Sequence, residues 1–176
     1  MRKVLVMLMT AAVAAGAQQQ QSSVMNPAVN AAKNNWVEVR TYLVRSADQM
    51  PESLYNFKPT PQVRSFGQII AHVAASQNSY CAIALGEKPR SESELEKSAT
   101  TKAAIVKALR ESNDYCDKAY SLSDADGNAA VSLFGSPSTK LGTLINNVGH
   151  DMEHYGNLVT YFRMKGMVPP SSQGGM

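Results

Sequence analysis

Three histidines are the residues of this chain that could perform metal chemistry. His150 and His154 lie four residues apart in the segment NNVGHDMEHYGN (residues 146–157), which has the character of a helix. Residues four apart in a helix lie on the same face, one turn from each other, so both imidazoles could reach one metal ion. The spacing alone leaves open a second interpretation, in which the two are partly buried polar residues without a ligand.

His72 is the third histidine and favours the metal interpretation. It lies in another predicted helix, beside the core positions Ile69 and Val73, where a buried imidazole costs free energy unless it has a partner. Three converging histidines are the ligand set of an open metal site, with a position left for water or substrate. The sequence therefore predicts that His72, His150 and His154 bind a divalent metal.

The imidazole ligands limit the choice of metal, and neighbouring residues could support them. Neutral nitrogen ligands favour zinc or nickel, with iron and copper as alternatives. Glu153, Asn157 and Tyr161 are candidates to orient the imidazoles, and Glu153 and Tyr161 are also candidate catalytic acid or base residues. HDMEH also fits the pattern of inverted zinc proteases, but too little chain follows His154 to supply their distant third ligand.

The N-terminus has the pattern of a secretory signal peptide at residues 1–17. A short basic start precedes an apolar run at 4–13, and the segment closes on Ala-Gly-Ala before a predicted cleavage after Ala17. A membrane-anchoring or buried N-terminal helix is the alternative. We expect an exported protein, periplasmic or secreted, without a membrane span after cleavage. Its 17 Lys and Arg residues, two of them in the signal peptide, nearly balance 14 Asp and Glu residues, which argues against a nucleic-acid partner.

The elements that must position the histidines are helical. Residues 18–25 are expected to be a disordered lead-in and residues 173–176 a flexible tail, with one all-α domain at 26–172. Apolar residues at helical spacing and capping signals predict four helices, which begin near Pro27, Ser65, Thr101 and Thr139. Asn26 is the predicted N-cap of the first helix, and Ser65 and Gln68 form a predicted capping box at the start of the second. Residues 87–98 read as a charged linker and 121–138 as a loop in which VSLFG is the only candidate strand. Four helices in one domain predict a four-helix bundle.

Two longer stretches resemble a known family. NFKPTPQVRSFGQIIAHVA and GHDMEHYGNLVTYFRMKGMVPPSS are similar to segments of the DinB/YfiT-like superfamily of metalloenzymes. The resemblance implies a bundle of up-down-down-up order, in which one histidine of the second helix and an HxxxH pair of the fourth bind a divalent metal. Those roles fall on His72, His150 and His154.

Cys81 and Cys116 are the only cysteines, and in an exported chain such a pair favours one disulfide. Two buried thiols are the alternative. In up-down-down-up order the second and third helices are parallel, and each cysteine then lies equally far from the start of its helix. The resemblance therefore strengthens the prediction of a Cys81–Cys116 disulfide.

These features predict a function only in outline. The family is similar in fold to thiol-dependent transferases, so the resemblance implies a metal-dependent transferase or hydrolase that acts on a small substrate, for which a thiol is one candidate. A non-catalytic helical bundle that binds a metal or ligand is the alternative. The expected partner is a small molecule, and a homodimer is left open.

Overall fold

Four long helices dominate the computed structural model, which describes residues 25–174. They are α2 (Pro27–Gln49), α3 (Phe66–Leu85), α5 (Lys102–Ala119) and α7 (Lys140–Met164). The predicted signal peptide and residues 18–24 of the predicted lead-in lie outside the described residues. No helix among residues 25–174 is long and apolar enough to cross a membrane.

Side-chain caps set the starts of three of these helices. At α3, Ser65 and Gln68 form the predicted capping box, in which each side chain accepts a hydrogen bond from the backbone N–H of the other. Gly86, at φ 79°, ends α3 in the left-handed conformation. Thr101 and Thr139 cap α5 and α7 by accepting hydrogen bonds from the backbone N–H groups of Ala104 and Gly142, without a returning side-chain hydrogen bond. The helix boundaries predicted from capping signals are therefore confirmed.

The start of α2 is capped by a different residue from the one the sequence predicts. Asn26 makes no side-chain cap and instead accepts a hydrogen bond from the backbone N–H of Asp124. The Asp124 carboxylate accepts hydrogen bonds from the N–H groups of Ala28 and Val29, at 3.1 and 2.8 Å. Asp124 begins the short helix α6 (Asp124–Gly127), so the cap comes from a distant part of the chain.

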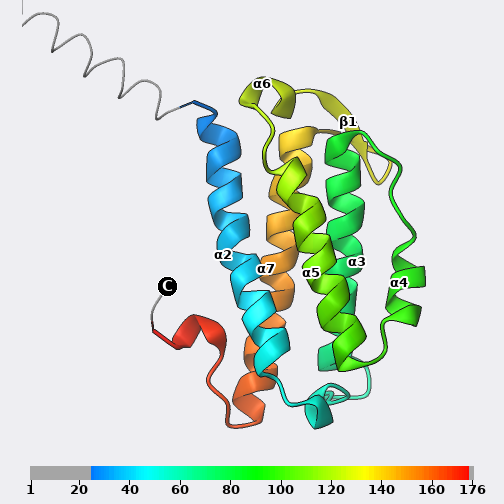
Figure 1. Cartoon of the computed structure of the whole chain (residues 1–176), viewed down its shortest axis with the longest axis vertical. Coiled ribbons are helices and arrows are strands. Elements are labelled where there is room, and N and C mark those ends of the chain that lie inside the picture. The colour runs from blue at the N-terminus through cyan, green and yellow to red at the C-terminus, as the bar shows by residue number, and fades with distance from the viewer. Residues whose placement is uncertain (1–24, 175–176) are drawn as a thin grey trace, which may run out of the picture.

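The helices run in the predicted up-down-down-up order. Figure 1 shows α2 and α7 running in one direction and α3 and α5 in the other. α3 packs between α5 and α7, and α2 completes the bundle against the same two helices. A disulfide joins Cys81 of α3 to Cys116 of α5, with a Cα–Cα distance of 5.3 Å. The predicted disulfide is confirmed, and it requires the parallel arrangement of these two helices.

Aromatic residues fill the centre of the bundle. Trp36 stacks on Tyr120 with ring centroids 4.4 Å apart, and Phe66 meets Phe162 edge-on. All four are at least 99% buried. The core thus lies where the predicted apolar stripes of the four helices meet.

Both long connections contain more regular structure than the sequence predicted, although the candidate strand VSLFG at 131–135 overlaps β1. The charged linker includes α4 (Glu92–Ser98), which has no buried residue. The loop before α7 contains α6 and a hairpin of β1 (Ala130–Leu133) and β2 (Ser136–Thr139). Phe134 and Gly135 form its turn with φ of 49° and 89°, as the common two-residue hairpin turn requires.

Two short 3-10 helices complete the structure, η1 (Glu52–Leu54) after α2 and η2 (Pro170–Ser172) near the C-terminus. Gln173, expected in the flexible tail, accepts a hydrogen bond from Arg45 and donates to Gln49 and the carbonyl of Val168. Contacts with α2 therefore continue past residue 172.

Candidate metal centre

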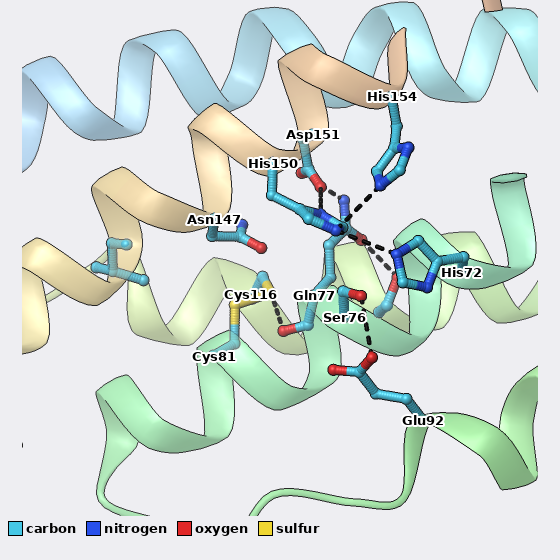
Figure 2. Close-up of polar contacts among 12 residues, drawn as sticks. His72, Ser76, Gln77, Cys81, Glu92, Cys116, Asn147, His150, Asp151 and His154 are labelled. Carbon is cyan, nitrogen blue, oxygen red and sulfur yellow. Dashed lines mark hydrogen bonds and ion pairs between the residues drawn. A yellow bond between two sulfur atoms is a disulfide. The ribbon is translucent and has the colours of Figure 1, made fainter. Parts of the chain in front are cut away.

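The structure brings the three histidines of the sequence together between two antiparallel helices. His72 lies in the second turn of α3, and His150 and His154 lie in consecutive turns of α7. The Nε2 atom of His150 is 3.2 Å from that of His72 and 3.1 Å from that of His154. Figure 2 shows the three rings pointing toward one another.

These separations fit a bound metal. Ligand nitrogens at 2.0–2.1 Å from a tetrahedral zinc ion are about 3.3 Å apart, close to the separations observed here. Within residues 25–174, no fourth His, Cys, Asp or Glu joins this group. A metal held by His72, His150 and His154 would therefore have a coordination position free of protein side chains.

A carboxylate orients the first of these histidines. Glu96 of α4 lies 2.7 Å from Nδ1 of His72. A carboxylate can only accept this hydrogen bond, so Nδ1 carries the proton and Nε2 keeps its lone pair for a metal. Glu92, one turn earlier in α4, accepts a hydrogen bond from Ser76 of α3. The two contacts hold α4 against α3 beside the histidines.

Burial favours the neutral form of His154. Burial, together with the charges of His150, His72 and Arg64, lowers its pKa to about 4. Neutral imidazole is the form that binds metal. The Nδ1 atoms of His150 and His154 are both buried and have no hydrogen-bond partner among the described residues, which is unusual for polar atoms inside a protein.

Asp151 lies next to His150 and is fully buried. Its Oδ2 accepts a hydrogen bond of 2.8 Å from the side-chain amide of Gln77, whose own oxygen accepts one of 2.6 Å from Ser112. Burial raises the pKa of the Asp151 carboxyl, against the opposing effects of His150 and Gln77. This network links α7, α3 and α5 next to the candidate site.

Tyr80 lies beside His150 and connects it to the hairpin turn. The ring of Tyr80 lies 5.7 Å from that of His150, and Phe134 of the hairpin turn packs edge-on against Tyr80. Burial and the nearby carboxylates raise the pKa of Tyr80, which keeps its hydroxyl protonated near neutral pH. The hairpin thus contributes to the surroundings of the candidate site.

The two predicted catalytic residues take different positions. Glu153 is exposed and makes no hydrogen bond or ion pair with any described residue. Tyr161 is buried, and its hydroxyl donates a 2.6 Å hydrogen bond to the backbone carbonyl of Arg64. Neither residue hydrogen bonds to a histidine in this structure, nor does Asn157. Their catalytic roles stay predictions.

A cavity of about 660 Å³ lies near the candidate site: Ala71 and Glu96 line it, but none of the three histidines does. It is bounded by the connection between α2 and α3, the first turns of α3, and α4. Glu96 is part of its wall, and Lys58, Arg64 and Lys97 add three cationic side chains. None of these three cations forms an ion pair in the part of the chain that the structure describes.

Comparisons with known proteins agree with this architecture. The family model of the DinB superfamily matches residues 35–158. A crystal structure of a DinB-like protein from Bacillus cereus is similar with a TM-score of 0.69 at 18% identity, covering 82% of this chain and 95% of that one. A DinB-like protein from Bacillus subtilis, YjoA, gives a TM-score of 0.64 at 20% identity, covering 86% and 100%.

YfiT from Bacillus subtilis is similar with a TM-score of 0.63 at 18% identity, covering 79% of this chain and 88% of that one. It is described as "a probable metal-dependent hydrolase with an unusual four-helix bundle topology". No curated protein matches the chain significantly. At these identities the solved structures show a shared fold. Because the matched residues 35–158 span most of the sequence and include all three histidines, the chain belongs to the DinB superfamily.

Proposed function

We propose that this protein is an exported, metal-dependent hydrolase or transferase that acts on a small molecule. The observation that carries the proposal is the convergence of three Nε2 atoms without a fourth His, Cys, Asp or Glu ligand among the described residues. A structural metal site is usually closed by four protein ligands, whereas a catalytic site keeps one position for water or substrate. When bound, the metal would act as a Lewis acid and lower the pKa of a coordinated water or thiol.

The protein's own residues prepare the site for this role. Glu96 keeps the Nδ1 proton on His72 and so presents Nε2 to the metal. Burial keeps His154 neutral. Tyr80 packs beside the His150 ring, and Phe134 of the hairpin turn packs on Tyr80.

The size and charge of the nearby cavity favour a small, negatively charged substrate. Its volume of about 660 Å³ is within the range of small-molecule sites, which is about 300–1,000 Å³. Lys58, Arg64 and Lys97 would attract a carboxylate or phosphate group. The similarity of the YfiT structure favours hydrolysis, and the resemblance to thiol-dependent enzymes makes a thiol acid a second substrate class to test.

The test compares purified protein loaded with zinc or nickel against the same protein treated with a chelator. A panel of small carboxylate-bearing esters and amides, together with thiol-transfer substrates, is expected to include at least one that is turned over only by the metal-loaded form. A His72→Ala variant is expected to be inactive on the same substrate. Stoichiometric metal binding without turnover of any substrate would favour a non-catalytic binding module.

Export is tested separately from activity. Expression of the full chain in a Gram-negative host, followed by fractionation and N-terminal sequencing, is expected to give a periplasmic protein that begins at Gln18. Full-length protein in the cytoplasm would contradict this part of the proposal.

A further inference from the structure

Asp151 is the only fully buried carboxylate among the described residues. Its Oδ2 is held by the side-chain amide of Gln77. Its Oδ1 is buried and has no hydrogen-bond partner within residues 25–174, and it lies 3.8 Å from Nδ1 of His150. That nitrogen is also buried and also lacks a hydrogen-bond partner there. Figure 2 shows the carboxylate next to the His150 ring, on the side away from His72.

This arrangement is unfavourable for the protein alone. A buried carboxylate with one neutral hydrogen-bond donor loses far more hydration energy than that donor returns. An asparagine would fill the same volume without the charge. Since the 3.8 Å separation is too long for a hydrogen bond but short enough for an ion pair, an electrostatic partner on the His150 side would account for the carboxylate.

The counterpart of this contact is found at His72. There, Glu96 lies 2.7 Å from Nδ1. Two of the three imidazoles thus have a carboxylate near the nitrogen that faces away from the cluster. If both are ionised once a metal is bound, the two carboxylates carry two negative charges, which equal the charge of one divalent ion bound by three neutral histidines.

We propose that Asp151 is a positioning residue for the metal centre: its carboxylate favours the proton on Nδ1 of His150, leaves Nε2 free as ligand, and balances with Glu96 the charge of a divalent ion. The hydrogen-bond chain from Ser112 through Gln77 fixes the carboxylate in place. The inference rests on the proposed metal function, because without a metal the carboxylate has nothing to balance.

The variant Asp151→Asn separates this role from a structural one. Burying an amide costs less than burying a carboxylate, so the metal-free variant is expected to melt at the same temperature as the wild type or higher. Zinc affinity, measured by competition with a chromophoric chelator, is expected to fall about 10- to 100-fold. Asp114→Asn makes the same change at an exposed position of α5. It serves as the matched control and should change neither the melting temperature nor the zinc affinity.

The outcomes distinguish the two proposals. If wild-type protein binds no zinc, the proposed function fails and this inference fails with it. If the wild type binds zinc and Asp151→Asn binds it within about twofold of wild-type affinity, only the inference is overturned. A lower melting temperature of the metal-free variant with unchanged zinc affinity would also overturn it, because that is the signature of a structural residue.

A second measurement needs no variant. In zinc-loaded wild-type protein with 15N-labelled histidine, imidazole correlation spectra are expected to show the proton of His150 on Nδ1. A proton on Nε2 of His150 would overturn the inference.

Discussion

The disulfide and the histidine cluster both join α3 to a neighbouring helix, but they do so in different ways. Cys81 and Cys116 link α3 to α5 through a covalent bond. The histidines bring α3 against α7 through nitrogen atoms that face one another at 3.1 and 3.2 Å. Gln77 lies between the two regions, with its carbonyl oxygen 3.4 Å from the sulfur of Cys116 and its side chain bonded to Asp151.

The difference lies in how each region satisfies its buried polar groups. Both half-cystines are fully buried and their sulfurs are bonded to each other, so that link is complete in the protein alone. Beside it, buried atoms of His150, Asp151 and His154 lack hydrogen-bond partners among the described residues. Proteins rarely leave buried polar atoms unpaired. The first region therefore stabilises the fold, whereas the second has the unpaired nitrogens that the proposed metal site requires.

Replacing one of the three histidines should show the difference between the two regions most strongly, because it should greatly weaken metal binding without unfolding the protein. His150→Ala removes the imidazole whose Nε2 lies nearest to both other histidines. Metal affinity is expected to fall by more than the roughly 100-fold that marks the loss of an outer partner, while far-UV circular dichroism shows unchanged helix content. Asn146→Ala, on the exposed side of the same helix, is the control. Tight stoichiometric binding by His150→Ala would show that the comparison is wrong.

Opening the disulfide should have the converse effect. The bond closes a loop with a sequence separation of 35, so the double variant Cys81→Ser/Cys116→Ser is expected to lose about 3–4 kcal/mol of unfolding free energy in the chain-entropy model. Urea denaturation of the variant, and of wild type reduced with dithiothreitol, measures this loss. Zinc stoichiometry should stay the same. A loss of zinc at denaturant concentrations where the variant is still folded would mean that the two regions are not independent.

Glu96→Gln should lower metal affinity while all three histidine ligands remain in place. The amide can no longer act purely as an acceptor for Nδ1 of His72, so the preference for the ligating tautomer decreases. Because the Glu96 side chain is 32% exposed, we expect a loss of metal affinity near the lower end of the range for such partners, about tenfold. Chelator competition measures it, and Glu94→Gln on the same short helix is the control. An equal loss of metal affinity in both variants would mean that the loss comes from the removed negative charge and not from the contact with His72.

The confirmed predictions depend on local signals, and the missing ones depend on tertiary contacts. The capping box of Ser65 and Gln68 is a four-residue pattern, and the HxxxH pair needs only helical spacing. That Cys81 and Cys116 lie at the same height along their helices followed from the up-down-down-up order that the resemblance implied. These features could be predicted because each is determined either by a short stretch of sequence or by a known fold.

The roles of Glu96 and Asp151 could not be read in this way. Glu96 lies in a charged segment without buried residues, and the segment forms α4 where its carboxylates bond to side chains of α3. Asp151 reads as one more polar residue of α7 until the position of Gln77 is known. The first strand of the hairpin overlaps the candidate strand VSLFG, but its turn and second strand were missed because the turn uses Phe134 and Gly135, whereas Asn-Gly or Asp-Gly is the usual signal.

Tyr161→Phe should have the smallest effect and tests a predicted catalytic residue. Its hydroxyl donates to the carbonyl of Arg64, and loss of one such hydrogen bond is expected to cost about 1 kcal/mol of stability. Metal affinity should not change. Thermal denaturation and chelator competition measure the two quantities. If turnover of an identified substrate falls far more than stability does, Tyr161 has the catalytic role that the sequence suggested.

The central claim is that three histidines form one metal centre, and X-ray absorption at the metal edge tests it most directly. Protein purified without an affinity tag and loaded with one equivalent of zinc should show three imidazole nitrogens at about 2.0–2.1 Å, with a non-imidazole ligand such as water at the remaining position. Fewer than three imidazoles per zinc, or an unchanged spectrum when His72, His150 and His154 are all replaced by alanine, would contradict the account.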